Sequence, residues 1–406
     1  MSTLKDIQYL IKEVDGSLEG PDQLTDVQAK EVWQFHKSIP AYKQTKLVKL
    51  DNLAEEMHVK GIYVKDESTR FGLKAFKGLG GTYAMFRVLC ERLGIHPADA
   101  DYTTFQASEV KEAVSKITFV TATDGNHGKG VSWAAGLFGC RAFVFMPKGS
   151  SEERAKAIRQ AGPAVVEITD KNYDETVAYA SRLSKENDWI LIQDTAWDGY
   201  EQIPLWIIQG YLTMANEAVT ELDAAGILPT HVFLQAGVGA MAGGVCGFLM
   251  NHYEGRRPVV CVVEPETVAC IYLSASYEDG KAHSVEGDPV TIMAGLNCGT
   301  PCKITWPVLR DFASAYFAVP DYVAADGMRR YAKPLNGDTA VISGESGAAT
   351  FGTVVKLLEN SDFEIIREQL GINSQSVILL INTEGDTDPV CYQSIVEDGA
   401  FSAPVK

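Results

Sequence analysis

The chain has 406 residues, of which 46% are hydrophobic and 22% are charged, and its formal net charge is −17. This composition is that of a globular protein long enough for two or three domains. The acidic charge argues against nucleic-acid binding, which needs a basic face. The N-terminal residues have no apolar core of signal-peptide length, and the least polar long run, 237–250, is too short to cross a bilayer. We therefore expect a cytoplasmic protein with no nucleic-acid or membrane partner.

Short apolar runs alternate with amphipathic segments along the chain, without internal repeats. The expected strands are 61–67, 117–122, 142–146, 165–168, 189–193, 231–235, 259–263 and 377–381. The expected helices are 82–93, 128–138, a helix that follows a Ser150–Glu153 capping box and ends at 160, 173–185, 203–222, 240–253 and 347–358.

Most of these strands are rich in Val and Ile and lack polar alternation, so they are expected to be buried on both faces. Helical crossovers between such strands produce parallel sheets. The sequence therefore predicts an α/β protein with open, doubly wound sheets. Ligands of such sheets bind beyond the carboxyl ends of the strands.

Lys77 follows the first of these strands, in the run Phe76-Lys77-Gly78-Leu79-Gly80-Gly81 before a helix. The positive end of a helix dipole disfavours a cation, and the apolar and glycine neighbours draw the ammonium out of water. A neutral amine is what a lysine needs to form a Schiff base with a carbonyl cofactor. The alternative is a surface lysine whose stem lies over Phe76.

Four polar or glycine-rich loops lie at strand ends or helix starts, at 123–128, 235–244, 342–348 and 381–388. The first two join a strand to a helix, where successive backbone N–H groups form an anion site. The other two are equally explained by a helix cap and a turn. Asp124 is unexpected in the first loop, because a carboxylate repels an anion.

The second loop also satisfies the dinucleotide pattern G-x-G-x-x-A, from Gly237 through Gly239. Glu264 stands at the end of the next strand, where an acid could bind a ribose. A nicotinamide-dependent dehydrogenase is therefore a rival hypothesis, although it leaves Lys77 and the 123–128 loop unexplained.

The eight cysteines form no C-x-x-C pair and no His/Cys cluster with zinc spacing, so no metal site is predicted. A disulfide among Cys270, Cys298 and Cys302 stays open, against the expectation for a reducing compartment.

Together, the lysine and these loops resemble the fold type II family of pyridoxal-phosphate-dependent enzymes, which includes threonine dehydratase, cysteine synthase and the tryptophan synthase β-subunit. The family's Schiff-base lysine lies in a Phe-Lys loop like 76–77, its asparagine loop is similar to 123–127, and its phosphate loop is similar to 237–244. The resemblance covers almost the whole chain. It implies a two-domain open parallel-sheet fold like that of the tryptophan synthase β-subunit, with a large cofactor-binding domain (1–80 and 200–406) and a small mobile domain (81–199).

Within this family the chain is most similar to the ammonia-lyases that act on 2,3-diaminopropionate, in the segments 65–68, 70–72, 123–128, 193–197, 235–244 and 383–388. This resemblance implies elimination of either enantiomer to pyruvate and ammonia by a homodimer that uses pyridoxal 5′-phosphate. A sibling lyase that acts on serine or threonine is an alternative, and a non-catalytic ligand sensor is another.

The expected catalytic residues are Lys77, Asp124 and Asp194. Lys77 would carry the cofactor and remove the α-proton of the L-isomer, while Asp124 would be the base for the D-isomer. A buried carboxylate needs a cation, so Asp124 favours a substrate with a second ammonium. Asp194 would be a second carboxylate beside the substrate's ammonium, or alternatively an aspartate of a strand-end turn or a helix N-cap.

Other contacts are implied by the same resemblance. Further cofactor contacts are expected at Phe76, Asn126, Gly237, Val238, Gly239, Ala240, Met241, Glu345, Asn382 and Thr383, and the partner of the ring nitrogen stays open between the last two. Further substrate contacts are expected at Thr123, Gly125, Asn126 and His127. His127 is alternatively a histidine packed beneath the loop.

Overall fold

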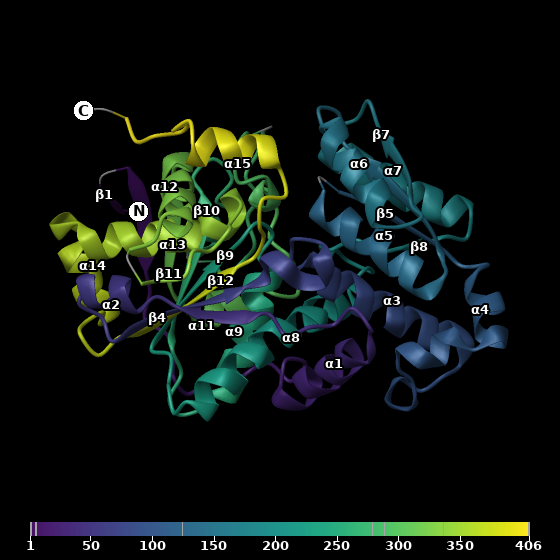
Figure 1. Cartoon of the computed structure of the whole chain (residues 1–406), viewed down its shortest axis with the longest axis horizontal. Helices are drawn as coiled ribbons and strands as arrows, with labels where there is room; N and C mark the ends of the chain where they lie inside the picture. Colours follow the sequence, from purple (N-terminus) through teal and green to yellow (C-terminus); the bar gives the residue numbers. More distant parts are fainter. Residues whose placement is uncertain are drawn as a thin grey trace. The chain divides into compact units, whose positions relative to one another are not determined.

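The computed structural model describes residues 2–4, 6–123, 125–277, 279–287, 289–335 and 337–404. The chain forms two compact units, each with its own sheet (Figure 1). Unit 1 comprises 1–26, 44–69 and 214–406, and unit 2 comprises 27–43 and 70–213. The segment 81–199, predicted to be a mobile domain, lies inside unit 2, and its mobility stays a prediction.

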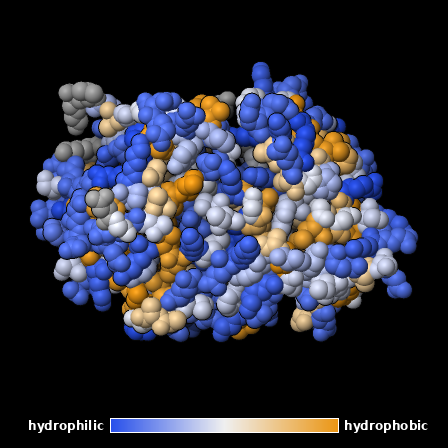
Figure 2. Space-filling view, in the orientation of Figure 1, coloured by the Kyte–Doolittle hydropathy of each residue, from blue (hydrophilic) through white to orange (hydrophobic). Residues whose placement is uncertain are grey.

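The surface agrees with the acidic, polar composition. Figure 2 shows a face on which hydrophilic side chains predominate, with hydrophobic residues in small groups between them. Among the described residues, no helix combines the length and the apolar composition that a membrane span requires.

Unit 1 is built on an eight-stranded mixed sheet with the strand order β1-β2-β11-β10-β9-β12-β4-β3. Its strands are β1 (Ser2–Leu4), β2 (Ile7–Ile11), β3 (Lys46–Lys49), β4 (Gly61–Asp66), β9 (His231–Gln235), β10 (Val259–Pro265), β11 (Ala313–Val319) and β12 (Val377–Asn382). The neighbours from β11 through β4 pair in parallel, whereas the β1–β2, β2–β11 and β3–β4 pairs are antiparallel. The parallel centre confirms the predicted fold class.

The antiparallel edges of this sheet are not predicted by the sequence pattern. The partly exposed strands β2 and β3 lack the continuous apolar run that marks a central parallel strand. β11 is also missed, because its sequence ASAYFAV mixes small residues with aromatic ones.

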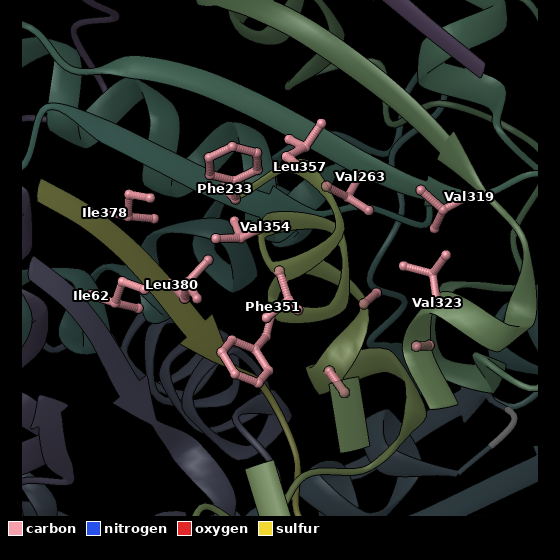
Figure 3. Packing of buried hydrophobic residues seen from close by; sticks show 14 of the residues in the cluster. Ile62, Phe233, Val263, Val319, Val323, Phe351, Val354, Leu357, Ile378 and Leu380 are labelled. Carbon is pink, nitrogen blue, oxygen red and sulfur yellow. The ribbon is translucent and has the colours of Figure 1, made fainter. Parts of the chain in front are cut away.

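Helices cover the sheet of unit 1, and α13 lies against its centre. Its side chains Phe351, Val354 and Leu357 belong to the same buried cluster as Phe233 of β9 and Leu380 of β12 (Figure 3). The helices of this unit are α2 (Asp51–Glu56), α9 (Ala240–His252), α10 (Cys270–Ser276), α11 (Trp306–Phe312), α12 (Asp321–Ala332), α13 (Glu345–Glu359), α14 (Glu364–Leu370) and α15 (Pro389–Val396). The short 3₁₀ segments are η4 (Ala294–Leu296) and η5 (Ser361–Phe363).

Unit 2 contains a four-stranded, fully parallel sheet with the order β7-β6-β5-β8. Its strands are β5 (Thr118–Ala122), β6 (Arg141–Met146), β7 (Val165–Ile168) and β8 (Ile190–Leu191). Its helices are α1 (Asp26–Ser38), α3 (Lys77–Leu93), α4 (Ser108–Val114), α5 (Asn126–Phe138), α6 (Glu152–Ala161) and α7 (Tyr173–Glu186). The segments η2 (Pro97–Asp99) and η3 (Tyr102–Gln106) also belong to it, whereas α8 (Gln202–Ala224) and η1 (Glu67–Gly72) run from one unit into the other.

Two local predictions in unit 2 need correction. The cap of α6 is Ser151, one residue later than expected, and its side chain accepts a hydrogen bond from the N–H of Arg154. The expected strand 189–193 is shortened to the two residues of β8. The N–H of Ile192 still donates to the carbonyl oxygen of Val120, and beyond it the side chain of Gln193 replaces a strand partner for the N–H of Ala122.

Helix α3 begins at Lys77, five residues before the predicted start. The glycines that follow Lys77 have low helix propensity and hide the helix in the sequence pattern, but they permit close packing. A Cβ on Gly210 of α8 would lie 2.6 Å from the Cα of Gly80, and one on Gly130 of α5 would lie 3.1 Å from the Cα of Gly78. Backbone contacts on two sides therefore hold the first turn of α3.

Glu264 near the end of β10 is fully buried, and both of its carboxyl oxygens bind the protein's own backbone. Oε1 accepts from the N–H of Ile271 at 2.8 Å, and Oε2 accepts from the N–H of Tyr272 at 2.7 Å. Burial raises the pKa of Glu264 to about 8, against the opposing effect of these hydrogen bonds. Glu264 is thus a structural carboxyl beneath α10, and it presents no acceptor to a ribose.

A pH dependence of stability follows from this burial. The folded state keeps a proton on Glu264 that the unfolded state releases above its ordinary pKa, so the stabilisation is complete below that ordinary pKa and is lost as the pH rises through about 8. Glu264→Gln cannot titrate, and it should reduce the fall in free energy of unfolding by up to about 1.4 kcal/mol per pH unit between about pH 5 and about pH 8. Urea denaturation across this range measures the slope. The control is Glu254→Gln, at an exposed carboxylate, and equal slopes for wild type and Glu264→Gln would contradict the expectation.

Candidate active site

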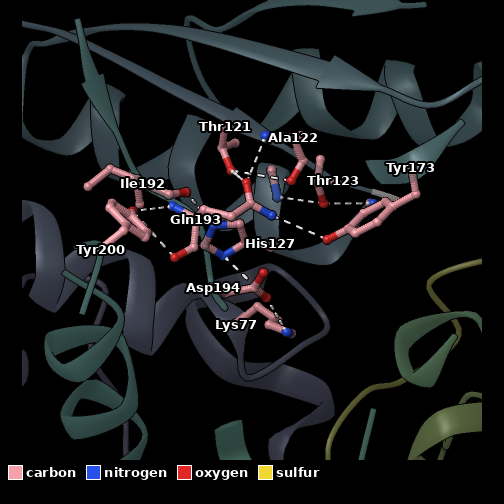
Figure 4. Close-up of polar contacts among 12 residues, drawn as sticks. Lys77, Thr121, Ala122, Thr123, His127, Tyr173, Ile192, Gln193, Asp194 and Tyr200 are labelled. Atoms are coloured by element: carbon pink, nitrogen blue, oxygen red, sulfur yellow. Dashed lines mark hydrogen bonds and ion pairs between the residues drawn. The ribbon is translucent and has the colours of Figure 1, made fainter. Parts of the chain in front are cut away.

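In unit 2, the amine of Lys77 lies beside the carboxylate of Asp194. Nζ of Lys77 donates a hydrogen bond to Oδ2 of Asp194 at 2.5 Å, and the two side chains are only 19% and 13% exposed (Figure 4). Nζ also lies 5.5 Å from the centre of the Phe76 ring. A charge-assisted bond in such a partly dry place is stronger than one at the surface. Two residues predicted to act in catalysis are therefore in direct contact.

Asp194 is held as an anion by this arrangement. Burial by itself raises the pKa of Asp194, but the charge of Lys77 and its hydrogen bond, together with a charge on His127 whenever that ring is protonated, outweigh burial, so the pKa of the carboxyl lies well below its ordinary value. The carboxylate is consequently ionised at neutral pH.

His127, in the first turn of α5, lies against the same carboxylate. Its Nε2 donates to the carbonyl oxygen of Ile192 at 2.8 Å, and its Nδ1 lies 3.8 Å from Oδ2 of Asp194 without a hydrogen-bond partner among the described residues. Burial lowers the pKa of His127 by more than the charge of Asp194 raises it. A neutral ring carries no charge, so we attribute the low pKa of Asp194 mainly to Lys77.

Gln193 holds the segment that carries Asp194. Its Oε1 accepts from the N–H of Ala122 at 3.1 Å and from the hydroxyl of Thr121 at 3.2 Å, while its Nε2 donates to the hydroxyl of Tyr173 at 3.2 Å (Figure 4). The side chain of Gln193 thus ties the chain before Asp194 to the end of β5.

Tyr200 completes this support from the other side. Its hydroxyl accepts from the backbone N–H of Gln193 at 2.7 Å and donates to the carbonyl oxygen of Leu191 at 2.9 Å. Burial raises the pKa of Tyr200 far above its ordinary value, so the phenol stays protonated. The sequence predicts no role for Gln193 or Tyr200. The signals for Gln193 are its place at the end of an apolar run and within the family-like segment 193–197.

The loop 123–128 is shaped by Thr123. Its hydroxyl oxygen accepts from the N–H of Gly125 at 3.0 Å and from the N–H of Gly128 at 3.2 Å. Asn126 is the first residue of α5, which has no side-chain cap. Asp124 lies outside the described residues, so its role stays a prediction.

In unit 1, the glycine-rich loop joins β9 to α9. Gly239 has a φ of 84°, in the region that favours glycine, and it stands at the N-cap of α9, where no side chain caps the helix. The first N–H groups of an uncapped helix are good donors to an anion. The structure places the five residues expected to bind phosphate at this one helix start: Gly237, Val238, Gly239, Ala240 and Met241.

Asn382 and Thr383, the two candidate partners of the ring nitrogen, differ in whether they keep a hydrogen-bond donor for a ligand. Nδ2 of Asn382 donates to Oδ1 of Asp66 at 2.8 Å and to the carbonyl oxygen of Ile342 at 3.0 Å, so both of its N–H groups are engaged. Thr383 is 3% exposed, and its hydroxyl oxygen accepts from Nε2 of Gln235 at 3.1 Å. Thr383 therefore keeps its own O–H as a donor, and Asn382 has none left.

Glu345, a predicted cofactor contact, is the first residue of α13 and is 8% exposed. Burial raises the pKa of Glu345 to about 7, and the charge of Glu384 acts in the same direction. This carboxyl is therefore able to donate or to accept a proton near neutral pH.

The remaining candidates for sites are cysteines and metal ligands. None of the eight cysteines, all within the described residues, forms a disulfide, and Sγ of Cys270 lies 3.5 Å from the carbonyl oxygen of Cys298. Within the described part of the chain, no group of three or more His, Cys, Asp or Glu residues is arranged to hold a metal ion.

Comparison with known proteins identifies the family. Residues 39–365 match a family model described as pyridoxal-phosphate dependent enzyme. The chain is 47% identical over 371 residues to the diaminopropionate ammonia-lyase of Salmonella typhimurium, across 91% of this chain and 92% of that enzyme.

Solved structures support the same family assignment. The crystal structure of the Escherichia coli diaminopropionate ammonia-lyase in complex with D-serine superimposes with a TM-score of 0.90 and 42% identity, covering 97% of this chain and 98% of that one. The same enzyme in complex with an aminoacrylate-PLP azomethine reaction intermediate gives a TM-score of 0.89 and 42% identity, covering 98% of each chain. The chain therefore belongs to the family of pyridoxal-phosphate-dependent enzymes and, within it, to the diaminopropionate ammonia-lyases.

Proposed function

We propose that this chain is a pyridoxal-phosphate-dependent ammonia-lyase that converts 2,3-diaminopropionate to pyruvate and two molecules of ammonia. The observation that carries the proposal is the mostly buried contact of 2.5 Å between Lys77 and Asp194. It occurs in a chain that is 47% identical to a diaminopropionate ammonia-lyase over 91% of its length.

The residues present fit the cofactor. When bound, pyridoxal phosphate supplies an aldehyde that joins the substrate amine and a ring that takes up the electrons left by the departing α-proton. We assign the amine of Lys77 to the aldehyde, the uncapped start of α9 to the phosphate, and the hydroxyl of Thr383 to the ring nitrogen. Phe76, Asn126 and Glu345 stay proposed contacts of the ring and its substituents.

Asp194 favours a diamine over serine or threonine. If the amine of Lys77 were engaged by the cofactor, it would no longer serve Asp194 as a free ammonium, and the ionised carboxylate would need another cation. A buried carboxylate without a cation is costly. The β-ammonium of 2,3-diaminopropionate supplies that cation, whereas the hydroxyl of serine or threonine does not.

Proton transfer is assigned to two residues. Lys77 would hold the cofactor and, as a free amine, would remove the α-proton of the L-isomer. For the D-isomer the α-proton points to the opposite side, and Asp124 is the proposed base. The electron pair of the broken C–H bond forms the new C=C bond while the β C–N bond breaks. The β-ammonium already carries its proton, so it leaves as ammonia, and hydrolysis of the released enamine yields pyruvate and the second ammonia.

The function is tested by pyruvate release from both enantiomers of 2,3-diaminopropionate, serine and threonine. Wild type should release pyruvate fastest from 2,3-diaminopropionate, and Lys77→Ala should lower that rate by a factor of at least about 10²–10⁴. After borohydride reduction, peptide mapping should find the pyridoxyl group on Lys77. Lys74→Ala, at an exposed lysine three residues away, is the control and should keep activity and label. A label on another lysine would refute the assignment, and faster turnover of serine or threonine would support the sibling-lyase alternative.

The roles of the two aspartates are separated by stereochemistry. Asp124→Asn should lower kcat/KM for the D-isomer by about 10²–10⁴, the usual effect of losing a general base, and spare most of the L-isomer activity. Asp194→Asn should lower kcat/KM for both enantiomers, because it removes the proposed partner of the β-ammonium that both of them carry. Equal losses on both enantiomers in Asp124→Asn would make Asp124 a binding residue only.

We further propose, from the family resemblance, that the enzyme is a cytoplasmic homodimer. Sedimentation equilibrium of the purified chain should yield a mass of twice the 44.2 kDa of one chain. A mass of one chain at micromolar concentration would exclude a stable dimer.

A further inference from the structure

The side-chain amide of Gln235 meets four oxygen atoms at the end of the sheet in unit 1. Its Nε2 lies 2.9 Å from the carbonyl oxygen of Ile381 and 3.1 Å from Oγ1 of Thr383. It also lies 3.2 Å and 3.5 Å from the carbonyl oxygens of Ser346 and Gly347, in the first turn of α13. Gln235 is 1% exposed and is the last residue of β9, beside β12. One nitrogen thus joins β9, β12 and α13.

These neighbours determine which position in the Gln235 amide is occupied by the nitrogen and which by the oxygen. Three of the four neighbours are carbonyl oxygens, which only accept hydrogen bonds. An amide oxygen in the place of Nε2 would face them without a proton, so the nitrogen must be there. The two acceptors nearest to this nitrogen are the carbonyl oxygen of Ile381 at 2.9 Å and the hydroxyl oxygen of Thr383 at 3.1 Å.

The direction of the Thr383 proton follows. A hydroxyl next to an N–H donor must accept from it, so its own hydrogen points away from Gln235. Without that donor, the hydroxyl of a threonine is able to rotate about its Cβ–Oγ1 bond, and nothing at position 235 holds its proton in one direction. The amide of Gln235 therefore removes a choice that the hydroxyl would otherwise have.

The other end of the same side chain shows that this arrangement carries a cost. Oε1 of Gln235 is buried and has no hydrogen-bond partner among the described residues. Such an unpaired acceptor typically costs about 1–3 kcal/mol, and an apolar side chain of similar volume would avoid that cost. The unpaired oxygen indicates that the N–H end serves a purpose other than stability.

We infer that Gln235 is a positioning residue, which directs the O–H of Thr383 outward so that the threonine acts only as a hydrogen-bond donor to the ring nitrogen of the cofactor. The inference rests on the proposed function, because it needs a bound pyridine ring. A donor at this place keeps the ring nitrogen without a proton. Gln235 would act through Thr383 and would not itself touch the cofactor.

A double-mutant cycle tests this role, with the holoenzymes of wild type, Gln235→Met, Thr383→Val and the double variant. The direct measurement is the nitrogen NMR shift of pyridoxal phosphate labelled at its ring nitrogen, together with the cofactor Kd. Gln235→Met should move the ring-nitrogen shift toward that of Thr383→Val and lower kcat about five- to tenfold, the value of one net hydrogen bond, with KM nearly unchanged. The double variant should resemble Thr383→Val, because residues that act in series are not additive.

A second substitution keeps the test informative if Gln235→Met fails to fold. Gln235→Glu keeps the size and shape of the side chain, and the surrounding carbonyl oxygens should hold its carboxyl protonated. It then has one O–H where Gln235 has two N–H groups, so Thr383 is able to turn its proton inward, and the same spectral change is expected.

Three results would overturn the inference. Unchanged ring-nitrogen shifts in both Gln235 variants would do so, and so would additive effects in the double variant, which indicate a merely structural residue. A wild-type chain that binds no pyridoxal phosphate would overturn the proposed function itself, and this inference with it.

Discussion

The chemistry of unit 2 depends on one ion pair, between Lys77 and Asp194. Removing two charges from water costs several kcal/mol for each, and the cost is offset only while each charge has its partner. Any event that neutralises the lysine amine leaves the carboxylate in need of another cation. This is why we propose that Asp194 favours a substrate that brings a second ammonium. The neutral His127 ring and the Gln193 side chain maintain the geometry without competing for that charge.

Unit 1 contributes donors rather than charges. The carboxyl ends of its parallel strands bring the uncapped start of α9, the start of α13 and Thr383 to one edge of the sheet, as open α/β sheets do for their ligands. Donors supplied by the backbone and by a hydroxyl are suited to a phosphate and to a pyridine nitrogen. Gln235 holds this edge together, and the unpaired oxygen at its far end marks a residue selected for more than packing.

Much of this organisation could be predicted from the sequence. Buried strands are short, apolar and separated by helices, so the α/β class and the positions of the central strands follow from local pattern. The order of the lysine, the asparagine loop and the glycine loop also indicates the family, since these motifs depend on local backbone geometry. The prediction fails where local pattern and tertiary packing disagree. Glycines hide the first turn of α3, half-exposed edge strands lack an apolar run, and a side chain replaces the end of β8.

By itself, then, the sequence determined the fold class, the family motifs and a candidate for the cofactor lysine, because each of these is encoded within a few consecutive residues. Only the tertiary structure decided that Asp194 contacts Lys77 and that Glu264 is a buried carboxyl beneath α10. It also decided that both N–H groups of the Asn382 side chain are bonded to Asp66 and Ile342. The physical reason is that the state of a polar group depends on burial and on its partners. Those partners come from segments far away along the chain, 117 residues for Lys77 and Asp194 and 316 for Asn382 and Asp66.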